Sequence, residues 1–178
     1  PEEKIAYEEK FLAEVLRNEY SGLNLSEKLA GFPGLGRKLM PMLRSPWPED
    51  VEYWKNRLRG ACQDVFFIAR PDKTPIYVDI MDDIAAKNGY PIADIGKYIQ
   101  PIEHNRACQV EFSLFYSQDD EEEKELVAKI NREATVALMN AGAFFSRPYG
   151  EVASIVYERA TNYTMALRRV KKVFDPKN

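Results

Sequence analysis

The chain has 178 residues, enough for one domain with a sizeable core, and its 45% apolar and 30% charged residues are ordinary for a globular protein. The net charge of −3 gives the molecule no general attraction to nucleic acid or anionic lipid, so we expect neither partner. One histidine and two cysteines argue against a His-rich or Cys-rich metal site and a disulfide framework, so we expect no metal. No signal peptide and no bilayer-length apolar run is visible, and we expect a cytoplasmic protein.

The N-terminal third combines one clear helix with a segment rich in turns. Residues 1–20 carry apolar side chains at helical spacing. Eight glycines or prolines punctuate residues 21–50, a pattern that favours turns and short helical pieces. The stretch 31–38 is glycine-rich but does not match a phosphate-binding loop, and no strand precedes it, so we interpret it as a structural turn. Pro48 and the two acids after it predict a helix to about residue 60. We assign residues 1–62 to a helical, turn-rich extension.

The remaining residues, 63–178, alternate between strand and helix patterns. The first predicted elements are a strand at 63–70, a helix at 75–88 and strands at 92–100 and 107–116. A long helix follows, which begins at the acidic run 119–123 and is stopped by Gly142. The last elements are a strand at 143–147 and a helix at 159–174. This order predicts an α+β, ferredoxin-like βαββαβ fold, an antiparallel sheet with helices on one face and extra N-terminal and C-terminal helices. The other face would remain for a partner domain, a ligand or a second copy of the chain.

Local patterns predict where the long helix begins and which side chains form the core. The acidic run 119–123 is interpreted as the N-terminus of the long helix, where acids oppose the positive end of the helix dipole. Cys108, within a strand, is expected to be a small core residue. The core-facing positions are expected to be Val110, Phe112, Leu114 and Tyr116 in the strand at 107–116, and Ile76, Ile80, Ile84 and Ala85 in the helix at 75–88.

Two polar residues are candidates for chemistry. Arg147 lies in the aromatic stretch 143–150. Because a guanidinium keeps its charge at any ordinary pH, an arginine on a short central strand either forms a structural ion pair or meets an anionic ligand, and spacing leaves both open. His104 lies just before the strand at 107–116. It is either a strand-end histidine or a proton-carrying group that faces a cofactor or substrate.

The end of the sequence resembles a flavoprotein family. Phe174-Asp175-Pro176-Lys177-Asn178 resembles the FDPNxILNPGK ending of FAD-linked oxidases with the vanillyl-alcohol-oxidase-type fold, and a basic helix precedes it in both. Members of the vanillyl-alcohol oxidase and 4-cresol dehydrogenase branch carry a Tyr-Arg pair about thirty residues earlier, and here Ser146-Arg147 lies 28 residues before Asp175. The similarity covers about residues 63–178.

The resemblance implies that residues 63–178 are the substrate-binding cap domain of an FAD-dependent oxidoreductase. Such an enzyme oxidises a small organic substrate, for example a 4-alkylphenol, by hydride transfer to flavin. Arg147 would stabilise negative charge near the flavin, and Ser146 replaces the tyrosine of the phenol-oxidising members, with Tyr149 close enough to substitute. The catalytic candidates are Arg147, Tyr149 and, by chemistry alone, His104; the substrate-binding candidates are Tyr116 and Ser146.

The resemblance also implies a partner. Because the chain begins at Pro1 and stops inside the recognisable ending, we expect a fragment, inactive alone, whose FAD-binding domain lies N-terminal in the same parent chain. A complete FAD site is not expected within these residues. Two alternatives stay open: a 2-hydroxy-acid oxidase of the lactate or glycolate type, because Arg147 suits a carboxylate equally well, and a non-catalytic ferredoxin-like module for dimerisation or regulation.

Overall fold

The computed structural model describes residues 1–23, 34 and 45–177, which fall into two compact units, Pro1–Val51 and Glu52–Asn178. In the first unit the helix predicted at residues 1–20 is confirmed as α1 (Glu2–Glu19). Most of the turn-rich segment 21–50, including the glycine-rich stretch 31–38 apart from Gly34, lies outside the described residues.

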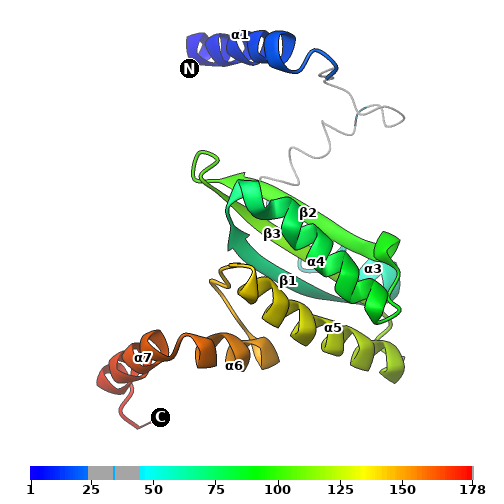
Figure 1. The fold of residues 1–178 in the computed structure, drawn as a ribbon, viewed down its shortest axis with the longest axis vertical. Coiled ribbons are helices and arrows are strands. Elements are labelled where there is room, and N and C mark those ends of the chain that lie inside the picture. The colour runs from blue at the N-terminus through cyan, green and yellow to red at the C-terminus, as the bar shows by residue number, and fades with distance from the viewer. Residues whose placement is uncertain (24–33, 35–44, 178) are drawn as a thin grey trace. The chain divides into compact units, whose positions relative to one another are not determined.

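The second unit is built on a three-stranded antiparallel sheet. Its strands are β1 (Ala61–Ala69), β2 (Ile95–Ile102) and β3 (Ala107–Tyr116), and β3 lies between the other two, in the order β1-β3-β2 (Figure 1). The register pairs Val65 with Phe112 on one side of β3, and Lys97 with Phe112 on the other. The predicted α+β class is confirmed, and the prediction for β3 is correct at both ends.

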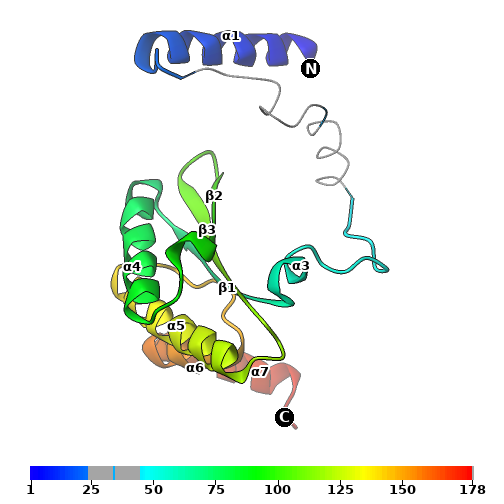
Figure 2. The same ribbon diagram turned by 90° about the vertical axis from the view of Figure 1, so that its right-hand side faces the viewer.

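Helices α4 (Thr74–Lys87) and α5 (Glu121–Asn140) pack on the same face of this sheet (Figure 2). Asp120 caps α5, since its carboxylate accepts a hydrogen bond from the Glu123 backbone N–H, and this confirms the interpretation of the acidic run. In α4 the prediction of the buried face is partly wrong: Ile76 is exposed, and the innermost stripe is Tyr77, Met81 and Ala85. The core between sheet and helices includes Val65, Phe67, Cys108, Val110, Phe112, Leu114, Tyr77, Met81, Val127, Ile130, Ala134 and Leu138.

The strand predicted at 143–147 is wrong in extent. Only Phe144 pairs with the sheet, as a single antiparallel bridge to Ile68 on the outer edge of β1. The next residue, Phe145, turns its ring into the core, 5.5 Å from the ring of Phe67, and this ends the pairing. After it come α6 (Gly150–Arg159), which the patterns did not predict, and α7 (Thr161–Phe174), which confirms the helix predicted at 159–174.

The helix predicted from Pro48 to residue 60 is also wrong. A single helical turn, α3 (Asn56–Arg59), forms in this stretch, and residues 48–55 are turns and irregular backbone. The physical reason is Lys55, whose side chain is drawn onto the sheet by the ion pairs described below. Gly60 ends α3 with φ of +90°, a left-handed conformation that lets the chain enter β1 directly.

Replacing Gly60 with alanine is expected to lower the free energy of unfolding by about 1–2 kcal/mol, the cost of forcing a residue with a Cβ into left-handed backbone. The added Cβ would meet only the backbone N of Gln118, at an ordinary 3.9 Å, so the cost is conformational and not steric. Gly22→Ala is the matched control, because Gly22 has no positive φ and no neighbour within 4 Å. Urea unfolding monitored by circular dichroism compares the two variants, and equal midpoints would contradict the prediction.

Candidate functional site

The sheet has a second face, turned away from α4 and α5, and its side chains are strongly polar near the middle. Because side chains alternate along a strand, residues between the core positions of β1 and β3 all point to this side. The register brings Asp64 opposite Ser113 and Phe66 opposite Glu111. We call this surface the polar sheet face; its members are Cys62, Asp64, Phe66, Tyr98, Gln100, Gln109, Glu111, Ser113 and Phe115.

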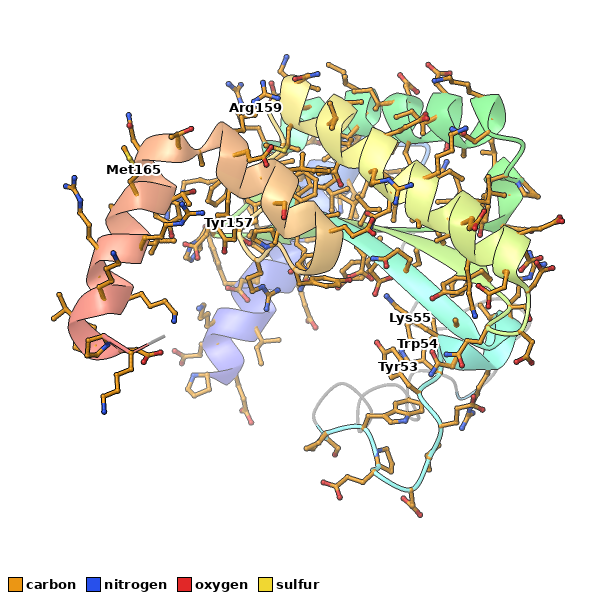
Figure 3. All side chains as sticks on the ribbon, turned by 90° about the horizontal axis from the view of Figure 1, so that it is seen from below. Tyr53, Trp54, Lys55, Tyr157, Arg159 and Met165 are labelled. Atoms are coloured by element: carbon orange, nitrogen blue, oxygen red, sulfur yellow. The ribbon has the colours of Figure 1, made fainter. Side chains whose placement is uncertain are left out.

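Lys55 lies on this face and is the centre of its polar contacts (Figure 3). Its ammonium donates hydrogen bonds to both carboxylate oxygens of Asp64, each at 2.8 Å, and to Oε1 of Glu111 at 2.6 Å. A further bond reaches Ser113 Oγ at 3.1 Å, and Ser113 in turn donates to Asp64 Oδ1 at 2.7 Å. Lys55 is only 5% exposed. One buried cation therefore fixes two carboxylates on neighbouring strands.

Burial and hydrogen bonding act on the pKa of Lys55 in opposite directions. Burial alone would lower the pKa of this ammonium, but the hydrogen bonds to Asp64 and Glu111 and the charges of both carboxylates outweigh it and raise the pKa above its ordinary value. Lys55 is therefore a permanent cation, unsuited to act as a base or nucleophile at neutral pH. Its role in this site is to balance the charges of Asp64 and Glu111 and to fix the positions of their carboxylates.

Cys62 lies beside this ion-pair cluster, and its thiol has low reactivity. Its thiol donates to Asp64 Oδ1 at 3.4 Å. Burial, with the nearby Asp64 carboxylate, raises the pKa of Cys62 to about 12. Because the thiolate is the reactive form, Cys62 is a poor nucleophile at neutral pH. Cys108, the second cysteine, is buried in the core, as predicted.

The predicted residues Arg147 and Tyr149 meet at the outer edge of β1, around Phe66. The guanidinium of Arg147 lies 5.5 Å from the centroid of the Phe66 ring, a cation–π contact, and the Tyr149 ring stacks on Phe66 at 5.9 Å. The expectation that Arg147 lies on a strand is wrong: it follows the bridge at Phe144 and is exposed. Among the described residues no carboxylate lies within ion-pair distance of it, so the reading as a structural ion pair receives no support.

Tyr149 is held by hydrogen bonds to β1. Its hydroxyl accepts from Gln63 Nε2 at 3.2 Å and donates to the backbone oxygen of Asp64 at 3.4 Å. Burial, and the nearby Asp64 carboxylate, raise the pKa of Tyr149 above the usual value, although the hydrogen bond from Gln63 opposes this. The hydroxyl therefore stays protonated at neutral pH and can donate a hydrogen bond. A cavity of only about 20 Å³ remains between Tyr149, Arg147 and β1, so this edge is a surface and not a deep pocket.

The other three predicted residues do not join this group. Ser146 is adjacent to Arg147 in the chain and is exposed. His104 lies in the tight turn between β2 and β3, exposed, with a left-handed φ of 55°. Tyr116, at the end of β3, packs against the core on the helix-covered side of the sheet. The structure therefore brings together two of the five predicted residues, Arg147 and Tyr149.

Sequence reasoning missed Lys55, Asp64 and Glu111, and one signal was available. Asp64 lies within β1, directly before the apolar run Val65 to Ala69, and a carboxylate there needs a partner cation when it is drawn toward the protein interior. The sequence does not point to the partner, because Lys55 falls within the helix predicted from Pro48 to about residue 60. Glu111 and Ser113 alternate with the predicted core residues of the strand at 107–116, a pattern that predicts their side of the sheet but no partner.

Two further properties concern the described residues only. They contain no cluster of three or more His, Cys, Asp or Glu side chains suited to hold a metal ion. No helix among them combines the length and apolar character needed to cross a membrane. Comparisons of this chain with protein-family models, with curated proteins and with solved structures gave no match.

Proposed function

We propose that this chain is the substrate-binding cap domain of an FAD-dependent oxidoreductase, acting on a small organic substrate such as a 4-alkylphenol. The sequence resemblance supports this through Phe174 to Asn178 and the spacing to Arg147. One structural observation carries it further: Arg147, exposed and without an ion-pair partner among the described residues, lies over the Phe66 ring, on which the Tyr149 ring also stacks. A cation and an aromatic ring suit an anionic aromatic ligand, to which the Tyr149 hydroxyl would donate its one proton in exchange for its long 3.4 Å bond to the Asp64 backbone oxygen.

In this proposal the fold is ferredoxin-like, with the fourth strand reduced to one bridge. The support is that Phe144 pairs on the outer edge of β1, giving the order Phe144-β1-β3-β2, with both long helices on one face. That arrangement places the Ser146–Tyr149 segment at the β1 edge next to the polar sheet face.

The described residues offer groups for part of a flavin site. Arg147 is a cation for a negatively charged flavin or substrate group, and Tyr149 carries a hydroxyl that would bond to the substrate. When bound in the intact enzyme, the flavin supplies the acceptor for a hydride from the substrate carbon. Arg147 would stabilise a phenolate or carboxylate, and Tyr149 would orient it.

The proposed partner is an FAD-binding domain of the same parent chain. Helix α7 supports a partner of some kind, because none of its residues is buried and Tyr163, Leu167, Val170 and Phe174 are exposed. A helix of 14 residues is marginal in water without packing on its apolar side. An open groove of about 790 Å³ runs between α6 and α7, with Tyr157 and Met165 among its lining residues (Figure 3).

The test is made in the intact parent enzyme. Arg147→Ala is expected to lower turnover on the preferred substrate by about 10²–10³-fold, the effect of losing one preorganised charge-stabilising group. Flavin should stay bound, as its absorption spectrum would show. Arg106→Ala, which removes an exposed arginine from the β2–β3 turn, is the control and should leave turnover unchanged. Unchanged kinetics in Arg147→Ala, or a parent chain without flavin, would remove the proposal. Turnover of lactate or glycolate but not of 4-alkylphenols would select the 2-hydroxy-acid alternative.

A further inference from the structure

The segment 52–60, here called the strap, crosses one end of the polar sheet face. In Figure 2 its helical turn α3 lies on the side of the sheet opposite α4 and α5. Ser113 and Phe115, at this end of the face, are 5% and 8% exposed, whereas Tyr98, farther from it, is 50% exposed. The two long helices cover the other face, and Lys55 of the strap bonds to Ser113, so the strap shields this end of the polar sheet face.

The strap buries little apolar surface, and ion pairs tie it to the sheet. Tyr53, Trp54 and Leu58 remain exposed, and α3 has no buried residue. Lys55 is its one deeply buried side chain, held by Asp64, Glu111 and Ser113 as described above. Near its end, Arg59 forms an ion pair with Glu123 of α5. A segment with so little buried apolar surface belongs to the least stable part of a fold, where local opening occurs without global unfolding.

We propose that the strap opens and closes over the polar sheet face, and that the ion pairs of Lys55 with Asp64 and Glu111 hold it closed. On opening, water solvates the Lys55 ammonium and both carboxylates. Because this hydration offsets the lost attraction between the charges, the free-energy cost of opening is mainly that of the broken hydrogen bonds. Opening uncovers Cys62, Ser113 and Phe115. The inference concerns access to this face of the sheet and does not depend on the proposed flavoenzyme function.

Cys62 reports strap opening, and Cys108 reports unfolding of the core. In the 178-residue chain under native conditions, the rate of reaction of each thiol with N-ethylmaleimide is followed by mass spectrometry. Removing the Lys55 charge raises the pKa of Cys62 further, because Lys55 lowers it in the folded chain. Electrostatics alone therefore predicts slower labelling of Cys62 in Lys55→Met. An increase in the rate can come only from greater access.

Lys55→Met is expected to increase Cys62 labelling by at least about tenfold, the effect of losing one hydrogen bond to a charged group, while Cys108 stays protected. Lys124→Met, the same change in an exposed ion pair with Glu121, should leave the rate unchanged. Unchanged or slower labelling of Cys62 in Lys55→Met would overturn the proposal.

A second variant covers the case in which Lys55→Met exposes Cys108 as well, which would mean that the core has unfolded. Ser113→Ala then decides, because it removes the 3.1 Å bond from Lys55 and the 2.7 Å bond to Asp64 but keeps both ion pairs of Lys55, and it also raises the pKa of Cys62. Faster labelling of Cys62 with Cys108 protected supports strap opening, and an unchanged rate overturns it. Hydrogen exchange at the backbone N–H groups of Asn56 and Gly60, which bond within the strap, should accelerate in parallel.

Discussion

Phe67→Ala is expected to lower the free energy of unfolding of the sheet-containing unit by about 3–5 kcal/mol, the cost of deleting a large aromatic side chain from a packed core. Phe67 is almost fully buried, and its ring contacts those of Tyr77 at 5.1 Å, Phe112 at 6.1 Å and Phe145 at 5.5 Å. These contacts join β1 to α4, to β3 and to the segment that carries Arg147. The variant should therefore loosen the candidate site as well as the core.

The neighbouring residue provides a matched control. Phe66 has the same side chain but points to the opposite face of β1, where it is only half-buried. Phe66→Ala is expected to cost much less stability, while it removes the ring beneath Arg147 and beside Tyr149. Chemical denaturation of both variants, with Phe67→Leu as a milder third, measures the difference. Equal losses in Phe66→Ala and Phe67→Ala would contradict the assignment of the two faces.

Lys55→Met is expected to lower the free energy of unfolding by about 3 kcal/mol, because it leaves two carboxylates close together without their cation. This loss is at the lower end of the range for breaking a buried ion pair. The side chains of Asp64 and Glu111 remain 25% and 20% exposed, so water screens part of the repulsion between their carboxylates. Urea denaturation at neutral pH measures it.

Replacing the Asp64 and Glu111 carboxylates with neutral amides tests whether their uncompensated charges cause this loss of stability. The triple variant Lys55→Met, Asp64→Asn, Glu111→Gln has lost the same ion pairs but holds no uncompensated charge, so it should regain more than about 1 kcal/mol relative to Lys55→Met alone. Lys124→Met, in an exposed pair, should change stability little. A triple variant no more stable than the single one would show that lost packing of the lysine stem, and not charge, causes the effect.

The sequence predicts most of the regular elements because their signals are local. The strict alternation of residues 107–116 defined β3, and the capping acids and apolar stripe defined α5. Helix α6 has apolar residues Val152 and Val156 four residues apart, a stripe too short to predict a helix and its bounds. The apolar run Val65 to Ala69 favoured a strand but concealed which of Phe66 and Phe67 faces the core, because a continuous run has no alternation to read.

The candidate site was less predictable because it depends on contacts between distant residues. Arg147 and Tyr149 are two residues apart, and sequence reasoning placed them together. Lys55 and Glu111 are far apart in the chain, and their contact exists only because β1 and β3 pair in one register. The failure of the helix predicted from Pro48 has the same origin: helical propensity is a weak preference, and the buried ion pairs of Lys55 override it.

The single bridge between Phe144 and Ile68 leaves the outer edge of β1 otherwise without strand pairing among the described residues. Unpaired strand edges invite pairing with other chains, and the opposite edge strand, β2, carries Lys97 and Pro101, which oppose such pairing. β1 has neither residue type. Its Asp64 carbonyl is instead occupied by side-chain hydrogen bonds from Gln63, at 3.0 Å, and from Tyr149. The bond from Tyr149 therefore obstructs pairing of another chain with this edge of β1.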